Sequence, residues 1–345
     1  MIKDTDISVL VQGPVIEKVT GTCLERIKEL LPNCQLIFST CSTSTETQNL
    51  RCDQLIHCKD PGAEKQSWHR KTVYNNINRQ IESTVVGLEA VDRLYCLKLR
   101  SDLYVDNLGF LGVYEESIRK DNNTSANKFK IFDHRLLANL LFTKYAAIVN
   151  DHFVRVPFHL SDWWFFGTSN DVRTYLSSAK KVIEPDYTNY FCRISSKNPF
   201  ETFERFSSEQ YLFISCFGKF FPAVNIQDSS VTHKNVIDSS TSLITNNFDV
   251  LDYERSGIYS LKYKKYYPEC LLGDIYICLW PNRNKIDNAL RDRGYMNYLI
   301  CSERLKKHEF KYSIASNRLQ RIIEAITVHI LKIKLYFFRA LRRDE

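Results

Sequence analysis

Three charged side chains stand at alternate positions where an apolar run ends. The apolar run Leu94–Leu99 contains Lys98 and is followed by Arg100 and Asp102. The two-residue period of a strand places these three side chains on one face. Charges at the end of a buried strand are costly unless they meet a ligand or one another. The pattern favours a phosphate- or metal-binding edge, and the alternative is a self-satisfied pair between Arg100 and Asp102.

A second candidate segment begins at His159. In it, Asp162 stands directly before four aromatic residues, of which the first two are Trp163 and Trp164. Aromatic walls can hold the face of a sugar while a carboxylate accepts hydrogen bonds from its hydroxyl groups. We expect His159, Trp163 and Trp164 to contact a sugar or an acceptor. The alternative is a core strand whose Asp162 only caps its entry.

The third candidate is Glu209, which follows Ser207 and Ser208 at the predicted start of a helix. A carboxylate at this place can serve as the general base that removes a proton from an acceptor hydroxyl. Acidic residues are also common in the first helical turn because they compensate the helix dipole, and this structural role is the alternative.

These candidates lie among alternating strands and helices. Apolar runs predict strands over 7–11, 35–39, 53–57 and 94–99, and a further strand over 163–166. Between them, a capping box at Thr22–Glu25 predicts a helix, and helical spacing predicts another over about 72–91. Strands separated by helices indicate a Rossmann-type, mostly parallel α/β sheet, which binds ligands at the carboxyl ends of its strands.

We divide the chain into three parts on these patterns. Residues 1–127 form the predicted nucleotide-binding half, and residues 128–300 form the catalytic and acceptor half of the same domain. Residues 301–345 form a basic tail, in which Lys306–Arg343 contains ten Lys or Arg side chains against two Glu. This excess is larger than the net charge of +7 of the whole chain, so the basic character belongs to the tail.

The tail predicts an amphipathic helix. Ile322, Ile326, Ile330 and Ile333 recur on one helical face that continues to Phe337. A basic amphipathic helix is typical of binding to an anionic membrane surface, and docking onto the body or a second subunit is the alternative. The residues expected to contact the membrane are Lys332, Lys334, Phe337, Arg339, Arg342 and Arg343.

Composition and missing motifs exclude several classes. With 345 residues and 44% hydrophobic residues, the chain can bury a large core. It has no apolar run of about eighteen uncharged residues, and its first residues lack the apolar region of a signal peptide, so we expect a cytoplasmic protein with reduced cysteines. Dinucleotide-binding, P-loop, serine hydrolase and zinc protease signatures are absent, as are nucleic-acid-binding motifs.

Four stretches together resemble a known family. They are Ile7–Val15, Asn75–Thr84, Lys98–Leu103 and Ser161–Gly167, and over roughly residues 5 to 240 the chain is similar to the WavE lipopolysaccharide synthesis family. The resemblance implies a GT-A-like bacterial glycosyltransferase. Such an enzyme would move a sugar from a nucleotide-sugar donor, UDP being favoured, to a lipopolysaccharide core, O-antigen or capsule acceptor. It would be peripheral on the inner face of the cytoplasmic membrane.

The resemblance also implies roles for residues around the donor. Gln12 and Gly13 would lie under the base and ribose, and Asn78 and Arg79 would flank the donor site. Lys98 would belong to the same donor-binding set.

The segment Arg100-Ser101-Asp102 takes the place of the Asp-x-Asp motif that holds a divalent cation, Mn²⁺ or Mg²⁺, and the diphosphate. Arg100 stands where the first acid would be, so either Asp102 binds a metal alone or Arg100 neutralises the diphosphate without one. Asp162 would bind donor or acceptor hydroxyls, and Glu209 would be the catalytic base of an inverting reaction.

Two other functions fit the same patterns. One is a non-catalytic, membrane-associated scaffold that has kept a nucleotide-binding fold, because a fold alone does not fix a function. The other is a CDP-dependent transferase of a polyol phosphate or sugar phosphate.

Overall fold

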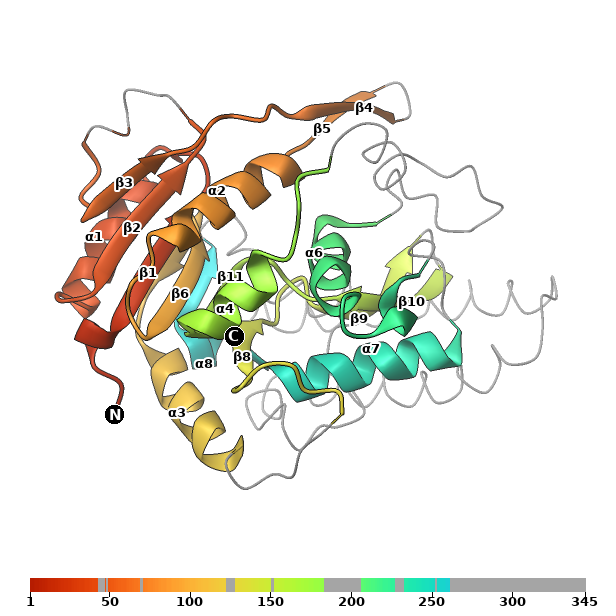
Figure 1. Cartoon of the computed structure of the whole chain (residues 1–345). Coiled ribbons are helices and arrows are strands. Elements are labelled where there is room, and N and C mark those ends of the chain that lie inside the picture. The colour runs from red at the N-terminus through yellow and green to blue at the C-terminus, as the bar shows by residue number, and fades with distance from the viewer. Residues whose placement is uncertain are drawn as a thin grey trace, which may run out of the picture.

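The fold is built around a seven-stranded sheet. A computed structural model describes residues 1–42, 47, 49–68, 71–121, 128–149, 152–182, 206–226, 233–251 and 253–260. The strand order is β12-β8-β11-β6-β1-β2-β3 (Figure 1). Its strands are β1 (Ile7–Gln12), β2 (Gln35–Thr40), β3 (Gln54–His57), β6 (Tyr95–Arg100), β8 (Leu136–Asn139), β11 (Trp164–Thr168) and β12 (Phe248–Leu251).

Most neighbouring strands are parallel. β1 pairs in parallel with β2 and β6, β2 with β3, and β8 with β12, whereas β11 runs antiparallel to both β6 and β8. Strands from both sides of the predicted boundary at residue 127 belong to this one sheet. The predicted fold class, a mostly parallel Rossmann-type sheet flanked by helices, is confirmed.

Helices cover both faces of the sheet. They are α1 (Thr20–Leu30), α2 (Ile77–Glu89), α3 (Gly109–Asp121), α4 (Ser169–Leu176), α6 (Ser208–Phe217), α7 (Lys234–Asn247) and α8 (Tyr253–Ser256), with 3-10 turns η1 (Asp4–Asp6) and η3 (Pro222–Val224). Phe165 and Phe166 point to opposite faces of β11. Tyr175 of α4 contacts Phe165, and Tyr114 of α3 contacts Phe166, so α4 and α3 lie on opposite faces.

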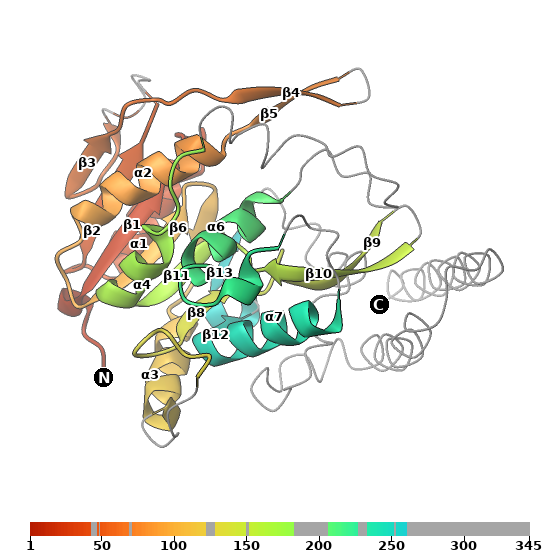
Figure 2. The same ribbon diagram turned by 45° about the vertical axis from the view of Figure 1, so that its right-hand side comes forward.

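Three two-stranded ribbons complete the described structure. They are β4 (Glu64–Trp68) with β5 (Lys71–Asn75), β7 (Leu103–Val105) with β13 (Ile258–Ser260), and β9 (Lys144–Val149) with β10 (His152–His159). Helices α6 and α7 pack along β10, as Figure 2 shows. No described helix is long and apolar enough to span a membrane. The predicted tail helix lies outside the described residues.

Two predicted helix starts are wrong, and in both cases contacts with residues outside the helix decide the start. The helix predicted from about residue 72 begins at Ile77, because residues 71–75 pair with β4 and the Ile77 N–H donates to Asn75 Oδ1 at 2.9 Å. The capping box at Thr22–Glu25 is not formed. Helix α1 begins at Thr20, whose Oγ1 donates to the carbonyl of Ser101 at 3.1 Å, and Thr22 lies inside the helix.

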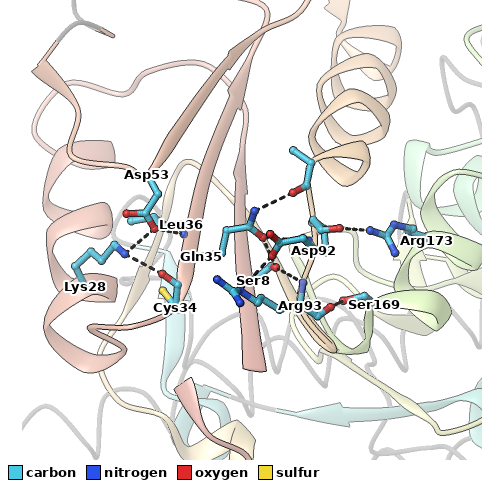
Figure 3. Close-up of polar contacts among 12 residues, drawn as sticks. Ser8, Lys28, Cys34, Gln35, Leu36, Asp53, Asp92, Arg93, Ser169 and Arg173 are labelled. Carbon is cyan, nitrogen blue, oxygen red and sulfur yellow. Dashed lines mark hydrogen bonds and ion pairs between the residues drawn. The ribbon is translucent and has the colours of Figure 1, made fainter. Parts of the chain in front are cut away.

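The amino ends of the central strands are joined by a polar network, which we call the amino edge (Figure 3). Ser8 Oγ donates to Gln35 Oε1, and Gln35 Nε2 donates to the Ala90 carbonyl at 2.9 Å. The guanidinium of Arg173 donates to the carbonyls of Leu88 and Val91, in the last turn of α2 and just beyond it. These bonds connect α2 to the sheet and α4 to the end of α2.

Candidate functional site

The candidate site lies at the opposite end of the sheet, which we call the carboxyl edge. It is formed by the ends of β1 and β6, the segment between β10 and β11, and the start of α6. The structure brings Arg100, Asp102, Asp162, His159 and Glu209 together here. These residues lie up to about a hundred positions apart in the sequence, so their proximity is a property of the sheet topology.

Arg100 is the centre of the charged cluster. Its Nε and Nη2 donate to the two carboxylate oxygens of Asp102, at 3.0 and 2.8 Å. Its Nη1 lies 3.7 Å from Asp162 Oδ1, and the guanidinium carbon lies 5.6 Å from the ring centroid of Trp163. Burial disfavours the charged form, but the carboxylates of Asp162 and Asp102 outweigh it and raise the pKa of Arg100. Arg100 is therefore a permanent cation.

One carboxylate oxygen of Asp162 has a described hydrogen-bond partner, and the other has none. Its Oδ2 accepts a hydrogen bond from Gln80 Nε2 at 2.6 Å, whereas its Oδ1 has no hydrogen-bond partner among the described residues. Only 5% of Asp162 is exposed. A buried acceptor without a partner is rare in folded proteins and calls for an explanation. A ligand hydroxyl is a suitable donor for this oxygen.

Lys98 lies beneath the cluster. The residue is almost fully buried, and its Nζ donates to the main-chain carbonyl of Asp162 at 2.8 Å. Burial lowers the pKa of Lys98 to about 8, although the charge of Asp162 opposes this shift. The sequence placed Lys98 with the donor-binding residues, and the structure places its ammonium under the Asp162 backbone. From there it positions Asp162 and adds positive charge below the site.

Glu209 stands in the first turn of α6, which begins where the sequence predicts. Ser207 Oγ accepts a hydrogen bond from the Gln210 N–H, and Gln210 Oε1 accepts one from the Ser207 N–H. Together these two bonds form a capping box. Gln210 Nε2 also donates to the Pro157 carbonyl at 2.9 Å, which ties this turn to β10. Burial and the charge of Asp162 raise the pKa of Glu209 to about 7.

His159 lies beside Glu209. Its Nε2 is 3.8 Å from Glu209 Oε2, and its Nδ1 has no partner within the described structure. Burial and the positive charge of Lys144 lower the pKa of His159 well below its ordinary value, so the imidazole is neutral at pH 7. The preceding residue, Phe158, has a φ of 58°, a strained conformation for an aromatic residue. Such strain is found most often at functional sites.

The end of β1 meets the end of β6 at the predicted donor site. The Ser101 N–H donates to the Gln12 carbonyl at 2.8 Å, and Ser101 Oγ donates to the Pro14 carbonyl at 2.6 Å. Gly13 has a φ of 133°, and a Cβ there would lie 2.6 Å from Ser101 Oγ, so only glycine fits. Gln12 Nε2 donates to Ser83 Oγ, while the buried Gln12 Oε1 has no described partner.

Three predicted site residues have structural contacts of their own. Asn78 Nδ2 donates to the Val182 carbonyl at 2.6 Å, and Asn78 Oδ1 accepts from the Val182 N–H at 2.7 Å. Arg79 forms two hydrogen bonds of 2.7 Å with the carboxylate of Asp60. Trp164 is fully buried and its ring packs near Phe110 on the α3 face. None of these hydrogen bonds and ring contacts, all among described residues, involves Arg100, Asp162 or Glu209.

Two residues of the cluster were not predicted from the sequence. Gln80 donates to Asp162, and it is one polar residue among several on α2. The buried Tyr175 hydroxyl has no described partner, and burial together with the charges of Cys216, Asp162 and Glu209 raises its pKa well above the ordinary value. No local signal distinguishes either residue, because only the folded chain brings them to Asp162.

The donor set at Arg100-Ser101-Asp102 does not fit a divalent cation. Both oxygens of Asp102 are occupied by the guanidinium of Arg100, which remains charged. Within the described ranges, no three His, Cys, Asp or Glu side chains are grouped as metal ligands. The predicted membrane residues Lys332, Lys334, Phe337, Arg339, Arg342 and Arg343 lie outside the described residues.

Comparisons with known proteins provide an independent view. A sequence model of the WavE lipopolysaccharide synthesis family matches residues 7–316. No curated protein shows significant similarity to the chain. Among solved structures, S. aureus TarS 1–349 in complex with UDP-GlcNAc is 15% identical, with a TM-score of 0.30, over 62% of this chain and 54% of that chain. The chain therefore spans about half the length of that TarS structure.

A second structure of S. aureus TarS 1–349 is 13% identical, with a TM-score of 0.31, over 89% of this chain and 92% of that chain. At these scores the likeness to TarS supports no functional argument. The family match covers most of the chain.

Proposed function

The chain belongs to the WavE lipopolysaccharide synthesis family, and from this premise we propose that it is a glycosyltransferase of cell-surface glycan synthesis. The donor is a nucleotide-sugar, with UDP as the favoured nucleotide. The acceptor is a lipopolysaccharide core, O-antigen or capsule glycan, free or lipid-linked. The observation that carries the proposal is a carboxyl group with a pKa of about 7, Glu209, beside the buried Asp162 and the partly buried pair of Arg100 and Asp102 at the carboxyl edge.

Glu209 is the proposed general base. A base works best when its pKa lies near the working pH, and Glu209 meets this condition because it is buried near Asp162. In the proposed inverting reaction, the carboxylate takes the proton of the acceptor hydroxyl while that oxygen attacks the anomeric carbon. The bond between the anomeric carbon and the phosphate oxygen breaks, and its electron pair leaves with the nucleoside diphosphate.

His159 and Asp162 are the proposed contacts to the sugar or acceptor. The neutral imidazole of His159 keeps a nitrogen near Glu209 without adding a charge there. Asp162 Oδ1 can accept a hydrogen bond from a sugar hydroxyl. Trp163 is also buried, and its ring flanks Arg100, whereas Trp164 is enclosed by the core.

Donor binding is proposed at the end of β1. Gln12 Oε1 is a buried acceptor without a described partner, and Gly13 lets the Ser101 side chain pack against the end of β1. The base and ribose of the donor would lie over these two residues. Asn78 and Arg79, which lie on the adjoining helix α2, would border this site.

We extend the proposal to the membrane. The basic amphipathic pattern of residues 301–345 suits the anionic inner face of the cytoplasmic membrane, where a lipid-linked acceptor would lie. Deleting residues from 318 onward should release the protein from anionic liposomes while activity on a soluble acceptor remains. Liposome binding that is unchanged by this deletion would contradict the membrane role.

The proposed function is tested by a thermal-shift screen with UDP, GDP, CDP, CMP and ADP. A ligand at one hundred times its dissociation constant adds about 2.7 kcal/mol of stability, which shifts the melting temperature by several degrees. One nucleoside diphosphate should stabilise the chain, and the product mass should then show transfer of a sugar without its phosphate. Stabilisation by none of the five nucleotides would favour a scaffold, and a product carrying a sugar phosphate would favour a phosphotransferase.

A further inference from the structure

The leaving diphosphate of the proposed reaction needs a positive partner at the end of β6. We infer that Arg100 is this partner, and that Asp102 and Asp162 hold Arg100 in place of a divalent cation. The inference rests on the proposed function, because it concerns the donor of that reaction. It assigns a metal-independent donor site to this chain.

Asp102 is unsuited to metal binding because both of its oxygens already bind a cation. The guanidinium forms two parallel hydrogen bonds with the carboxylate, at 3.0 and 2.8 Å, which is the strongest arrangement that Arg and a carboxylate can form. The charge of Arg100 is permanent, since the nearby carboxylates raise its pKa. A divalent cation at Asp102 would have to share both oxygens with this guanidinium and would be repelled by it.

The other carboxylates nearby do not supply a replacement ligand set. Asp162 Oδ2 is occupied by Gln80 at 2.6 Å, and Asp162 Oδ1 faces Arg100 Nη1 at 3.7 Å. Glu209 has a pKa of about 7, so part of its population carries a proton that a metal would have to remove. In the part of the chain that the structure describes, no group of three potential ligands forms.

Arg100 still has capacity for an anion. A guanidinium has five N–H donors, and the contact with Asp102 uses only Nε and Nη2. Nη1 is beyond hydrogen-bond distance of Asp162 Oδ1, and 31% of the Arg100 side chain is exposed. A phosphate oxygen can therefore reach Nη1 while Asp102 and the ring of Trp163 fix the plane of the guanidinium.

The charge balance leaves the positive charge of Arg100 available. Two carboxylates, Asp102 and Asp162, adjoin one guanidinium, and alone they would make the cluster negative. Lys98 lies beneath them, bonded to the Asp162 carbonyl at 2.8 Å, and supplies a second positive charge. Arg100 can thus bind an entering diphosphate in a cluster that is close to neutral.

The test uses the full chain, with Mn²⁺ and UDP as probes. Electron paramagnetic resonance measures the free Mn²⁺, and thermal shift measures UDP binding with Mn²⁺ or with EDTA. We expect the wild-type chain to leave Mn²⁺ free and to bind UDP equally in both conditions. Arg100→Ala should weaken UDP binding at least tenfold, and Mn²⁺ should not restore it.

Arg100→Asp creates an Asp-Ser-Asp sequence and therefore tests a metal-dependent site at the same place. This variant should bind Mn²⁺, and its UDP binding should depend on Mn²⁺. Arg100→Lys keeps the charge without the two-pronged contact, so it should bind UDP more weakly than wild type and stay independent of metal. Arg100→Ala and the wild-type measurements keep the test decisive if Arg100→Asp does not fold.

Two results overturn the inference, and they are distinguishable. Stoichiometric Mn²⁺ binding by the wild-type chain, with UDP binding lost in EDTA, contradicts the metal-independent site and leaves the glycosyltransferase proposal intact. Failure of the wild-type chain to bind any of the five nucleotides, with or without Mn²⁺, removes the proposed function and this inference together.

Discussion

The two ends of the central strands satisfy their buried polar groups in different ways. At the amino edge, Ser8 and Gln35 bond to each other and to the backbone that follows α2, and Arg173 closes the end of that helix. At the carboxyl edge, buried acceptors such as Gln12 Oε1 and Asp162 Oδ1 have no partner in the described structure. The two edges belong to the same strands.

This difference separates stability from function. A polar group that is fully bonded inside the protein stabilises the fold, whereas a buried group without a partner costs free energy. The carboxyl edge also contains Glu209, Lys98 and His159, whose burial opposes their charged forms. Proteins retain such costly groups where a ligand or a reaction needs them. Substitutions at the two edges should therefore have opposite effects.

The largest effect is expected for Glu209→Gln. The amide cannot take a proton from the acceptor, so the transfer rate should fall by roughly a thousandfold, within the range for loss of a general base. Glu82→Gln is a matched control, because Glu82 of α2 is also 19% exposed and its carboxylate pairs with Lys181. A steady-state assay should show full activity for the control. Comparable activity in Glu209→Gln would remove Glu209 from the mechanism.

The pH dependence of kcat/KM should also depend on the ionisation of Glu209. Since the base must be deprotonated and the pKa of Glu209 is about 7, kcat/KM should rise tenfold per pH unit below 7 and level off above it. Between pH 5 and pH 7 the expected gain is on the order of a hundredfold. A flat profile over this range would show that another group limits the reaction.

The stability of Glu209→Gln should reveal the cost of the carboxyl edge. The folded-state pKa of Glu209 is raised from 4.5 to about 7, so the folded chain holds this proton longer than the unfolded chain. Its contribution to stability is present below about pH 4.5 and is lost as the pH rises to about 7. At pH 8 the variant should be more stable than wild type by on the order of 2 kcal/mol, whereas at pH 4.5 the two should be similar.

Thermal melts of both proteins at the two pH values measure this difference. Equal melting temperatures at pH 8 would mean that the carboxylate carries no penalty in the folded state, and the contrast between the edges would lose its main support.

The amino edge should behave in the reverse way. Arg173→Met removes the hydrogen bonds to Leu88 and Val91 and should lower stability by about 1–2 kcal/mol, with kcat/KM unchanged. Arg93→Met is the control at the same edge, because the contact of the Arg93 side chain among the described residues is an exposed pair with Asp92. Chemical denaturation and steady-state kinetics together check both variants. Loss of activity in folded Arg173→Met would show that the two edges are coupled.

The sequence predicted most of the sheet because its strands carry a local signal. The apolar runs at 7–11, 35–39, 53–57, 94–99 and 163–166 correspond to β1, β2, β3, β6 and β11. The segment Ser207–Gln210 likewise predicted the start of α6. In contrast, the sequence missed the strand at residues 71–75, whose spacing suits a helix. These residues pair with β4, and their own spacing does not show this because the pairing depends on a partner strand.

The candidate site likewise has features that the sequence predicted and features that depend on the fold. The sequence by itself determined which charged residues end the strands and that Arg100, rather than an acid, precedes Ser101 and Asp102. Only the tertiary structure decided that Arg100 donates hydrogen bonds to Asp102, that Gln80 donates one to Asp162, and that Glu209 has a pKa of about 7. The physical reason is that residue type and spacing act locally, whereas burial and charge–charge interactions depend on which distant segments the fold brings together.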